Sequence, residues 1–352
     1  MMEPRVSAKD VARHVGVSVA TVSNVINNIN KVSEETRQRV LRAIEELHYQ
    51  PDFTARSLAK RKSNLLGIML PITQAGDDKS LLLKDNPFYA ELLSGIEYEA
   101  EQRKYDVVIT GIRPEQSLKD WVRKRNMDGV IFLGITPEPF LNELKTLHVP
   151  VVLMDSHPGQ TDCHSIGHDD FLAGKMACQH LTAMGHERIA FLSGKLQPSP
   201  VNTSRYMGYQ EALKEAGLPQ DPSLVMEDSV SFEGGYRMGL TIAEMHKKPE
   251  KGQRVTALFC VADIVAFGAI KALREKKIKV PDEISVVGFD NLKTCDYLIP
   301  GLTTIDQDIF RKGMAAVGTL VDDIEGRAKE CRQVLFPVRL VERDSVSRPI
   351  IK

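Results

Sequence analysis

The chain of 352 residues is longer than one ordinary hydrophobic core supports, so we expect two or three domains. Its composition, 42% hydrophobic and 26% charged, is typical of a soluble globular protein. The net charge of −1 hides an asymmetry, because residues 1–63 carry eleven Lys/Arg against seven Asp/Glu and the remainder carries 35 against 40. A basic head on an acidic body is typical of a small nucleic-acid-binding module joined to a larger domain.

The cysteine pattern and the absence of apolar runs indicate the compartment. The five cysteines are dispersed and form no Cys-x-x-Cys pair: Cys163, Cys178, Cys260, Cys295 and Cys331. This favours reduced thiols in a cytoplasmic protein over a zinc site or a disulfide framework. We expect no signal peptide, because Met1–Asp10 has no apolar run, and no membrane span. We assign no cofactor.

Two short helices are predicted at the N-terminus. Ala8–Val15 has helical character, Gly16 suits a left-handed turn, and Ser18 can cap a second helix by accepting an unpaired amide hydrogen. One face of the second helix is apolar and presents Val22, Val25 and Ile26 at helical spacing. The other face is thin and carries small or hydrogen-bonding groups: Ala20, Thr21, Ser23, Asn24 and Asn27.

Such a face fits the DNA major groove, so the segment predicts a helix-turn-helix. The alternative, an ordinary helical hairpin, is left open by spacing alone. A third helix should follow Ser33, which caps it, while Glu34 and Glu35 complement the positive end of the helix dipole. Its expected apolar face is Val40, Leu41, Ile44 and Leu47.

The segment after Pro51 has two interpretations. Residues 53–60 favour a helix that is too short to be stable alone in water, which suits a basic, solvated linker. Alternatively, the segment is a hinge that becomes helical on DNA, with Leu58 as an apolar wedge in the minor groove. Four cations would then neutralise phosphates: Arg56, Lys60, Arg61 and Lys62.

Residues 5–67 resemble the head and hinge of the lac repressor/purine repressor family of bacterial transcription regulators. The matching segments are Asp10-Val11-Ala12, Gly16-Val17-Ser18, Thr21-Val22-Ser23, Val25-Ile26-Asn27, Val32-Ser33, Thr36-Arg37, Tyr49-x-Pro51, Ala55-Arg56-x-Leu58-Ala59 and Ser63. With the helix pattern, the resemblance implies operator DNA as a partner and these contact residues: Ser7, Ser18, Val19, Ala20, Thr21, Ser23, Asn24, Asn27, Lys31, Ser33, Thr36, Arg37, Ala55 and Leu58.

Two positions depart from the family pattern. Asp52 stands where the family usually has Asn, and its carboxylate repels a phosphate that an amide would bind. Asn24 stands where many members have Arg or His. Because an amide prefers adenine and Arg prefers guanine, we expect a different operator base at that position.

From Leu65 onward, predicted strands alternate with helices. The first set consists of strands at Leu65–Ile72, Tyr105–Ile112, Asp128–Ile135 and Pro150–Asp155 and helices at Pro87–Lys104, Leu118–Asn126 and Phe140–Leu147. The second consists of helices at Asp169–Met184, Arg205–Ala216, Phe232–Glu244 and Asp263–Glu275 and strands at Arg188–Ser193, Thr256–Val261 and Ile284–Phe289. This α/β pattern predicts parallel sheets in two lobes, with a ligand cleft at the carboxyl ends of the strands.

The body resembles the periplasmic sugar-binding fold carried by the same family. The resemblance implies three crossings between lobes, near residues 165, 293 and 327, with Leu302–Ile305 returning to the first lobe and Gln333–Val341 in the second. The expected domains are a head at 1–48, a hinge at 49–63, a first lobe at 64–165 and 297–325, and a second lobe at 166–293 and 329–352.

Strand ends suggest where a small-molecule effector binds. Asp155 and Asp290 each end a predicted strand, and Arg205, expected to open a helix, offers a rigid fork of donors. The resemblance implies that Arg205 and Asp290 are the family's effector arginine and aspartate. It also implies that three aromatic residues stack on the ligand: Phe88, Tyr89 and Phe232.

Structural roles are the alternatives for these and other residues. Asp155 can cap a turn, Arg205 can pair with an acid, and Phe88 and Phe232 can belong to the core. We expect Asp263 to be a helix N-cap and Trp121, the only tryptophan, to be a packing residue. Three histidines are expected to be solvated loop residues: His157, His164 and His168.

No phosphate-binding glycine motif or zinc-protease motif is present, so we expect a regulator rather than an enzyme. A solute-binding transport protein shares the body fold but would not carry the DNA-binding head. Ser199 stands where purine-binding relatives have a second arginine, which favours a neutral sugar over a nucleobase as effector. The resemblance implies a homodimer on a pseudo-palindrome, and the absence of a C-terminal leucine heptad disfavours a tetramer. Whether the effector releases DNA or holds it stays open.

Overall fold

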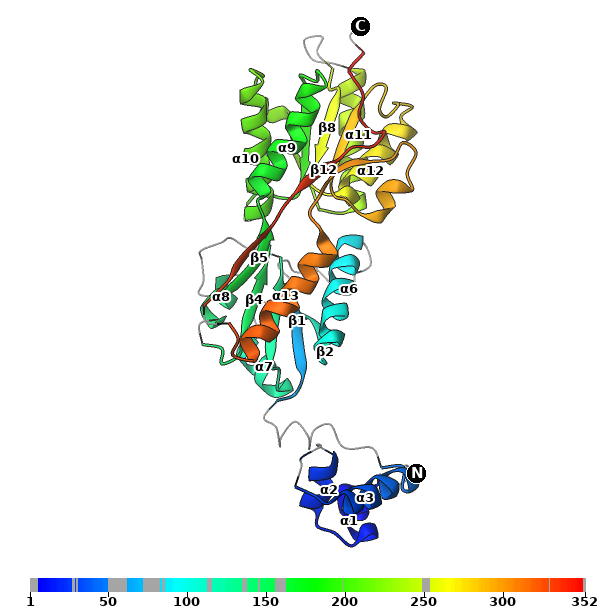
Figure 1. Ribbon diagram of the computed structural model, residues 1–352. Coiled ribbons are helices and arrows are strands. Elements are labelled where there is room, and N and C mark those ends of the chain that lie inside the picture. The colour runs from blue at the N-terminus through cyan, green and yellow to red at the C-terminus, as the bar shows by residue number, and fades with distance from the viewer. Residues whose placement is uncertain are drawn as a thin grey trace. The chain divides into compact units, whose positions relative to one another are not determined.

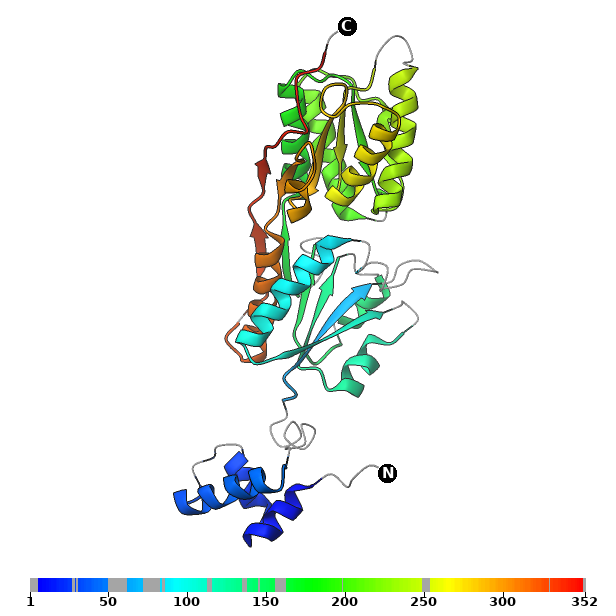
Figure 2. The same cartoon turned by 90° about the vertical axis from the view of Figure 1, so that its right-hand side faces the viewer.

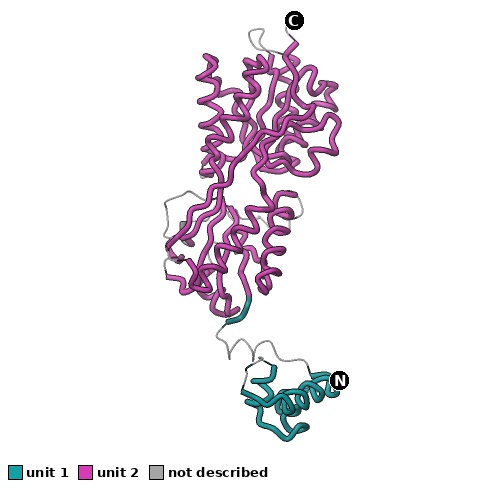
Figure 3. The backbone as a smooth tube through the Cα atoms, in the orientation of Figure 1, with its two compact units in different colours: residues 1–64 teal, residues 65–352 magenta. Residues whose placement is uncertain are grey.

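The computed structural model describes residues 6–26, 29, 31–49, 62–71, 83, 86–112, 116–134, 138–144, 146–155, 163–197, 199–248, 254–328 and 330–350. The chain divides into two compact units, Met1–Asn64 and Leu65–Lys352 (Figure 3). No helix within the described ranges is long and apolar enough to span a membrane. The predicted hinge helix at 53–60 lies outside these ranges.

The first unit is a three-helix head consisting of α1 (Ala8–Val15), α2 (Val19–Ile26) and α3 (Glu34–Glu46) (Figure 1). Gly16 has a φ of 73° and ends α1 in the left-handed conformation, as predicted. Ser18 and Ser33 accept the amide hydrogens of Thr21 and Thr36, which confirms both predicted N-caps. These caps and the glycine turn fix where each helix begins.

The apolar core of the head differs from the prediction at one position. Val22 and Val40 are fully buried, but Leu41 is 37% exposed. Leu41 lies about 100° around α3 from Val40, so it faces solvent, whereas Ala43, three residues after Val40, is buried. Tyr49, after the end of α3, is also buried in this core.

The second unit contains two six-stranded sheets whose orders are β11-β5-β4-β3-β1-β2 and β12-β10-β9-β8-β6-β7. Strands of the first are β1 (Leu65–Pro71), β2 (Asp106–Ile112), β3 (Gly129–Leu133), β4 (Val151–Met154), β5 (His164–His168) and β11 (Gln333–Phe336). Strands of the second are β6 (Ile189–Ser193), β7 (Val225–Glu227), β8 (Ala257–Cys260), β9 (Ser285–Asp290), β10 (Thr303–Asp306) and β12 (Arg339–Val341). The pairings are parallel except that of β10 with β12, as the alternating pattern predicted.

Helices cover both faces of each sheet (Figures 1 and 2). In the first lobe they are α6 (Pro87–Gln102) and α13 (Ile309–Ile324) on one face and α7 (Leu118–Arg125) and α8 (Glu138–Leu144) on the other. In the second lobe they are α9 (Asp170–Ala183) and α10 (Pro200–Glu215) against α11 (Phe232–Lys247) and α12 (Asp263–Glu275). Two 3₁₀ turns, Pro222–Leu224 and Lys293–Asp296, complete the described elements.

The sheet pairings correct the predicted lobe boundaries. Thr303 pairs with Val287 of the second sheet, so the strand at 303–306 does not return to the first lobe. Gln333 pairs with Ser165 of the first sheet, so 333–336 does not belong to the second lobe. The first crossing follows β5, close to the expected position near 165, but the other two follow β10 and β11 instead of lying near residues 293 and 327.

Other elements also differ from their predictions. The helix expected to open at Arg205 begins at Pro200, because Ser199 caps it by accepting the amide hydrogen of Asn202. Besides the two 3₁₀ turns, three elements of the described residues were not predicted: β5, β7 and α13. The remaining predicted helices and strands are present with bounds that shift by a few residues.

Two glycines of α13 differ in how closely they approach neighbouring atoms, so their substitution by alanine tests the packing of α13 on α6. A Cβ on Gly313 would lie 2.5 Å from the carbonyl oxygen of Leu92, whereas the nearest atoms to a Cβ on Gly318 are 3.8 Å away. We expect Gly313→Ala to lower the free energy of unfolding by about 1–3 kcal/mol through overpacking. Gly318→Ala should raise it by about 0.5–1 kcal/mol, because alanine favours a helix. Urea unfolding measures both changes, and equal effects of the two substitutions would contradict the packing.

Candidate functional site

The outward face of α2 carries the predicted DNA-contacting residues. Val22 and Val25 turn inward onto the core of the head. Ser18, Val19 and Ala20 are exposed, whereas Thr21, Ser23 and Asn24 are partly exposed. The structure therefore leaves an accessible strip of small and hydrogen-bonding side chains along one side of the helix.

The other predicted contact residues of the head lie before and after α2 in the sequence. Ser7, Lys31 and Ser33 are exposed, and Thr36 and Arg37 are partly exposed. The oxygen of Ser33 is engaged in its cap, which orients Thr36 by a hydrogen bond of 2.9 Å between the hydroxyls. Six predicted contact residues lie outside the described residues: Asn27, Ala55, Arg56, Leu58, Lys60 and Arg61.

In the second unit, a buried group of polar side chains lies where the lobes are connected. We call it the junction cluster, and it consists of Asp155, His168, Asp170, Arg205, Asp290, Gln307 and Lys312. Its members come from the ends of β4, β5 and β9, from α9, α10 and α13, and from the crossing between β10 and α13. Three of the predicted effector residues are therefore brought together.

Lys312 is the fully buried cation of the cluster. Its Nζ donates to Asp155 Oδ1 at 2.5 Å and to Gln307 Oε1 at 2.8 Å, and it lies 3.3 Å from His168 Nδ1. These contacts match the three donors of an ammonium group. A buried charge with this set of partners is compensated by an opposite charge and by hydrogen bonds.

His168 connects the Lys312 contacts to Arg205. Its Nε2 lies 2.9 Å from Asp170 Oδ1, and the same carboxylate oxygen accepts from Arg205 Nε at 2.7 Å. Since Nδ1 faces the ammonium of Lys312, we assign the ring proton to Nε2, where it donates to Asp170. Burial opposes ionisation of Asp170, but the nearby Arg205 and His168 outweigh it and hold the pKa of this carboxyl below its usual range.

Arg205 is oriented by contacts on three sides. Besides Asp170, its Nη1 donates to the carbonyl oxygen of Val261 at 2.6 Å, and the guanidinium carbon lies 3.5 Å from the ring centroid of Phe289. The predicted alternative that Arg205 pairs with an acid is therefore present in the structure. A ligand would meet a guanidinium that is already held in place.

Asp290 and Tyr89 are two buried groups of the site whose pKa values are both raised. Burial, together with the charge of Asp263, raises the pKa of Asp290 well above its usual value. Gln307 Nε2 donates to its Oδ1 at 2.5 Å. Burial first, and then the nearby Asp155 and Asp290, raise the pKa of Tyr89 to about 12, so the phenol keeps its proton at neutral pH.

The other predicted aromatic residues lie in two places. Phe88 packs edge-on against Tyr89, with 5.3 Å between ring centroids, at the start of α6. Phe232 is the first residue of α11 and packs, partly exposed, against the apolar core. Phe88 also packs, partly exposed, against the same apolar core, so the observed contacts of both Phe88 and Phe232 suit their structural alternative.

Asp263 and two of the three histidines differ from their predicted structural roles, whereas Trp121 does not. Asp263 is not an N-cap; Ala262 occupies that position, and the Asp263 carboxylate accepts from Leu292 N and Thr304 Oγ1. His164 and His168 are buried β5 residues instead of solvated loop residues, and His157 lies outside the described residues. Trp121 is confirmed as a packing residue, since it contacts the first-lobe core and Arg125 stacks on it.

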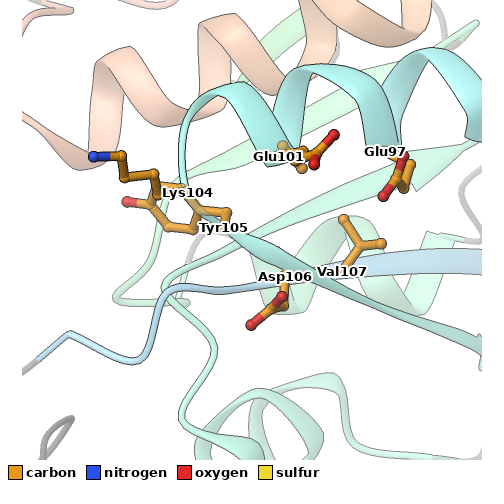
Figure 4. A pocket seen from close by; sticks show the side chains of 7 residues that line it. Glu97, Glu101, Lys104, Tyr105, Asp106 and Val107 are labelled. Atoms are coloured by element: carbon orange, nitrogen blue, oxygen red, sulfur yellow. The ribbon is translucent and has the colours of Figure 1, made fainter.

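A separate open hollow of about 550 Å³ lies beside the end of α6 and the edge strand β2 (Figure 4). It is lined by Glu97, Ala100, Glu101, Lys104, Tyr105, Asp106 and Val107. None of these is a predicted site residue. Among the residues that the structure describes, no group of His, Cys, Asp and Glu side chains has the arrangement of a metal site.

Comparisons with known proteins match both units. The family of "Bacterial regulatory proteins, lacI family" matches residues 7–52, and that of "Periplasmic binding protein-like domain" matches residues 178–346. The chain is 34% identical over 344 residues to the HTH-type transcriptional repressor PurR of Histophilus somni (strain 129Pt), covering 96% of this chain and 98% of that protein.

Solved structures agree with these matches. The lac repressor dimer bound to operator and the anti-inducer ONPF has a TM-score of 0.81 and 28% identity, covering 97% of this chain and 99% of that one. A transcriptional regulator CelR–cellobiose complex has a TM-score of 0.71 and 27% identity, covering 97% and 100%. These likenesses agree with a regulator and not with an enzyme.

The buried carboxyl of Asp263 predicts a pH dependence of stability. Burial raises its pKa to about 6, so its contribution to stability is fully present below the unfolded value, about pH 4, and is lost as the pH rises through about 6. The asparagine of Asp263→Asn does not titrate. Its free energy of unfolding should therefore fall by up to about 3 kcal/mol less than that of the parent protein over this pH range. Urea unfolding between pH 4 and 7 measures it, with the exposed Asp282→Asn as the control. Parallel pH curves for Asp263→Asn and the parent protein would refute this role.

Proposed function

The chain belongs to the lacI family of bacterial regulatory proteins, and from this premise we propose that it represses transcription from operator DNA under the control of a small molecule bound at the junction cluster. The observation that carries the proposal is the cluster itself. It gathers Asp155, Arg205 and Asp290 at strand and helix positions of both lobes. In α/β folds, ligands bind at these carboxyl ends of strands.

We assign operator recognition to the outward face of α2. Thr21, Ser23 and Asn24 offer hydroxyl and amide groups to base edges, and the exposed Val19 and Ala20 offer apolar contact to a thymine methyl group. The remaining proposed contacts position the head on DNA: Ser7, Ser18, Asn27, Lys31, Ser33, Thr36, Arg37, Ala55 and Leu58. A homodimer would place two such heads on a pseudo-palindrome.

The charge balance of the junction cluster favours a neutral effector. Lys312 is paired with Asp155, and Arg205 is paired with Asp170. Burial and the neighbouring Asp263 raise the pKa of Asp290, so a further charge at this position is disfavoured. Uncharged hydrogen-bonding groups beside Tyr89 and Phe88 suit a sugar, with one apolar face on an aromatic ring. A cellobiose complex among the structural relatives supports this ligand class.

A nucleobase effector is the second candidate, because the repressor PurR is a relative. The position at which purine-binding relatives are expected to carry a second arginine is Ser199 here. Its hydroxyl caps α10 and therefore orients a helix. This difference favours the sugar.

The crossings between the lobes suggest how a ligand bound at the junction cluster changes the conformation of the rest of the chain. Arg205 and Asp290 belong to second-lobe elements, whereas Asp155 and Lys312 belong to the first lobe. A ligand that contacts both sets changes the relative stability of lobe arrangements, and a typical coupling between two such sites is about 1–3 kcal/mol. We propose that the hinge at 49–63 transmits the change to the head of a cytoplasmic homodimer.

Asn24→Ala tests the recognition surface. The operator is first identified by selection: genomic fragments are incubated with the parent protein and an excess of competitor DNA, and the fragments that stay bound are recovered. Loss of a bidentate amide contact should weaken operator binding by about 1–3 kcal/mol while salt-sensitive binding to nonspecific DNA persists. Fluorescence anisotropy measures both affinities, and Glu45→Ala, on the exposed side of α3, is the control. Unchanged operator preference in Asn24→Ala would remove α2 from the readout.

Arg205→Lys tests the effector site. A thermal-shift screen against neutral sugars, sugar phosphates and nucleobases identifies the ligand, because binding to the folded state raises the melting temperature. The lysine keeps a positive charge beside Asp170 but lacks the guanidinium fork. We expect at least a tenfold loss of ligand affinity by calorimetry with operator affinity retained. Parental ligand affinity in a folded Arg205→Lys would place the site elsewhere.

A further inference from the structure

Two cysteines lie at the starts of neighbouring strands. Cys163 immediately precedes β5 (His164–His168), and Cys331 lies two residues before β11 (Gln333–Phe336). The two strands are parallel neighbours in the first sheet, although 168 positions separate the cysteines in the sequence. Neither position was singled out by sequence spacing.

The register of β5 and β11 points to a pairing of the two cysteines. The first bonded pair is Gln333 with Ser165, and the same register carried two residues further back matches position 331 with position 163. The two strands stay hydrogen-bonded to within one residue of the cysteines, because Ser165 N donates to the carbonyl oxygen of Arg332 at 2.9 Å. Arg332 N in turn donates to His164 Nδ1 at 2.9 Å. Arg332 and His164, the residues that follow the two cysteines, are therefore hydrogen-bonded to each other.

The side chains of this pair share one face of the sheet. Partners on parallel strands project to the same side, and residues two apart on an extended chain do so as well. On that face Ser165 is partly exposed and Gln333 is exposed, and correspondingly Cys163 is partly exposed and Cys331 is exposed. Adjacent strands lie about 4.8 Å apart, within the roughly 4.4–6.8 Å between Cα atoms that a disulfide requires.

We propose that Cys163 and Cys331 are a redox-responsive pair that forms a reversible disulfide when the protein meets a peroxide. The more exposed Cys331 thiolate attacks the peroxide; an S–O bond forms, the O–O bond breaks, and with hydrogen peroxide one water leaves. The Cys163 sulfur then attacks the sulfenic sulfur, which forms the S–S bond and releases a second water. The two thiols lose two protons and two electrons, and a dithiol reductant restores them by exchange.

The position of the proposed disulfide predicts an effect on the stability of the protein. β5 continues into the crossing to α9, and β11 continues into the crossing to β12. A bond between their starts closes a loop that contains the whole second-lobe segment from α9 to β10. Closing so long a loop restricts the unfolded chain, so the oxidised protein should unfold at a higher temperature.

Oxidation of the full-length protein with hydrogen peroxide tests the proposal. We expect non-reducing peptide mapping to recover a Cys163–Cys331 linked peptide, which dithiothreitol removes. The melting temperature should rise by several degrees on oxidation and return on reduction. Cys331→Ser and Cys163→Ser should each abolish the linked peptide and the rise. Gln333→Ser, an exposed neighbour on the same strand, is the matched control and should behave as the parent protein does.

Two results would overturn the proposal. One is a peroxide-treated parent in which Cys331 becomes sulfinic acid or cross-links two chains while Cys163 still reacts with an alkylating reagent. The other is a linked peptide that forms without any change in melting temperature, which would contradict the restraint on the crossing strands. Neither result bears on operator binding or on Arg205, so the proposed function is tested separately.

Discussion

The buried ammonium of Lys312 is the interaction on which the arrangement of the body depends. Its partners come from three separate parts of the chain: Asp155 after β4, His168 at the end of β5, and Gln307 between β10 and α13. An unpaired charge in this place would be costly, since breaking a buried pair typically destabilises a protein by about 3–5 kcal/mol. The cation thus holds two crossing segments against the end of a first-lobe strand.

Around this cation, charges and neutral groups are separated. His168 connects Lys312 to Asp170 and Arg205, so the paired charges form one continuous set. Burial raises the pKa values of both Asp290 and Tyr89, so charge is disfavoured in this part of the cluster. This separation is the physical reason for proposing a neutral, hydroxyl-rich ligand. It also explains why a ligand there would be sensed by both lobes.

Local signals in the sequence predicted the local structure well. The glycine turn at Gly16 and the caps at Ser18 and Ser33 depend on neighbouring residues only, and all three are confirmed. The helix expected at Asp263–Glu275 has the predicted bounds. The alternation of strands and helices likewise predicted two parallel-rich sheets, because burial on both faces makes central strands continuously apolar.

The features that were missed depend on distant pairing. Thr303–Asp306 and Gln333–Phe336 are short strands whose lobe is decided by the neighbour they bond to, which no local pattern reveals. Lys312 was not singled out in the sequence and His168 was expected in a solvated loop; both join the junction cluster only because the crossings bury them together. The cysteine at 163 acquires its partner through the same pairing of β5 with β11.

In the proposed mechanism, occupancy of the junction cluster and operator affinity are coupled. The most direct measurement is the dissociation constant of the full-length protein for its operator, determined at fixed salt with and without a saturating ligand. Coupling predicts a change of roughly 5–150-fold in either direction, the usual range for two coupled sites. A ligand that saturates the cluster and leaves the operator dissociation constant unchanged would contradict it.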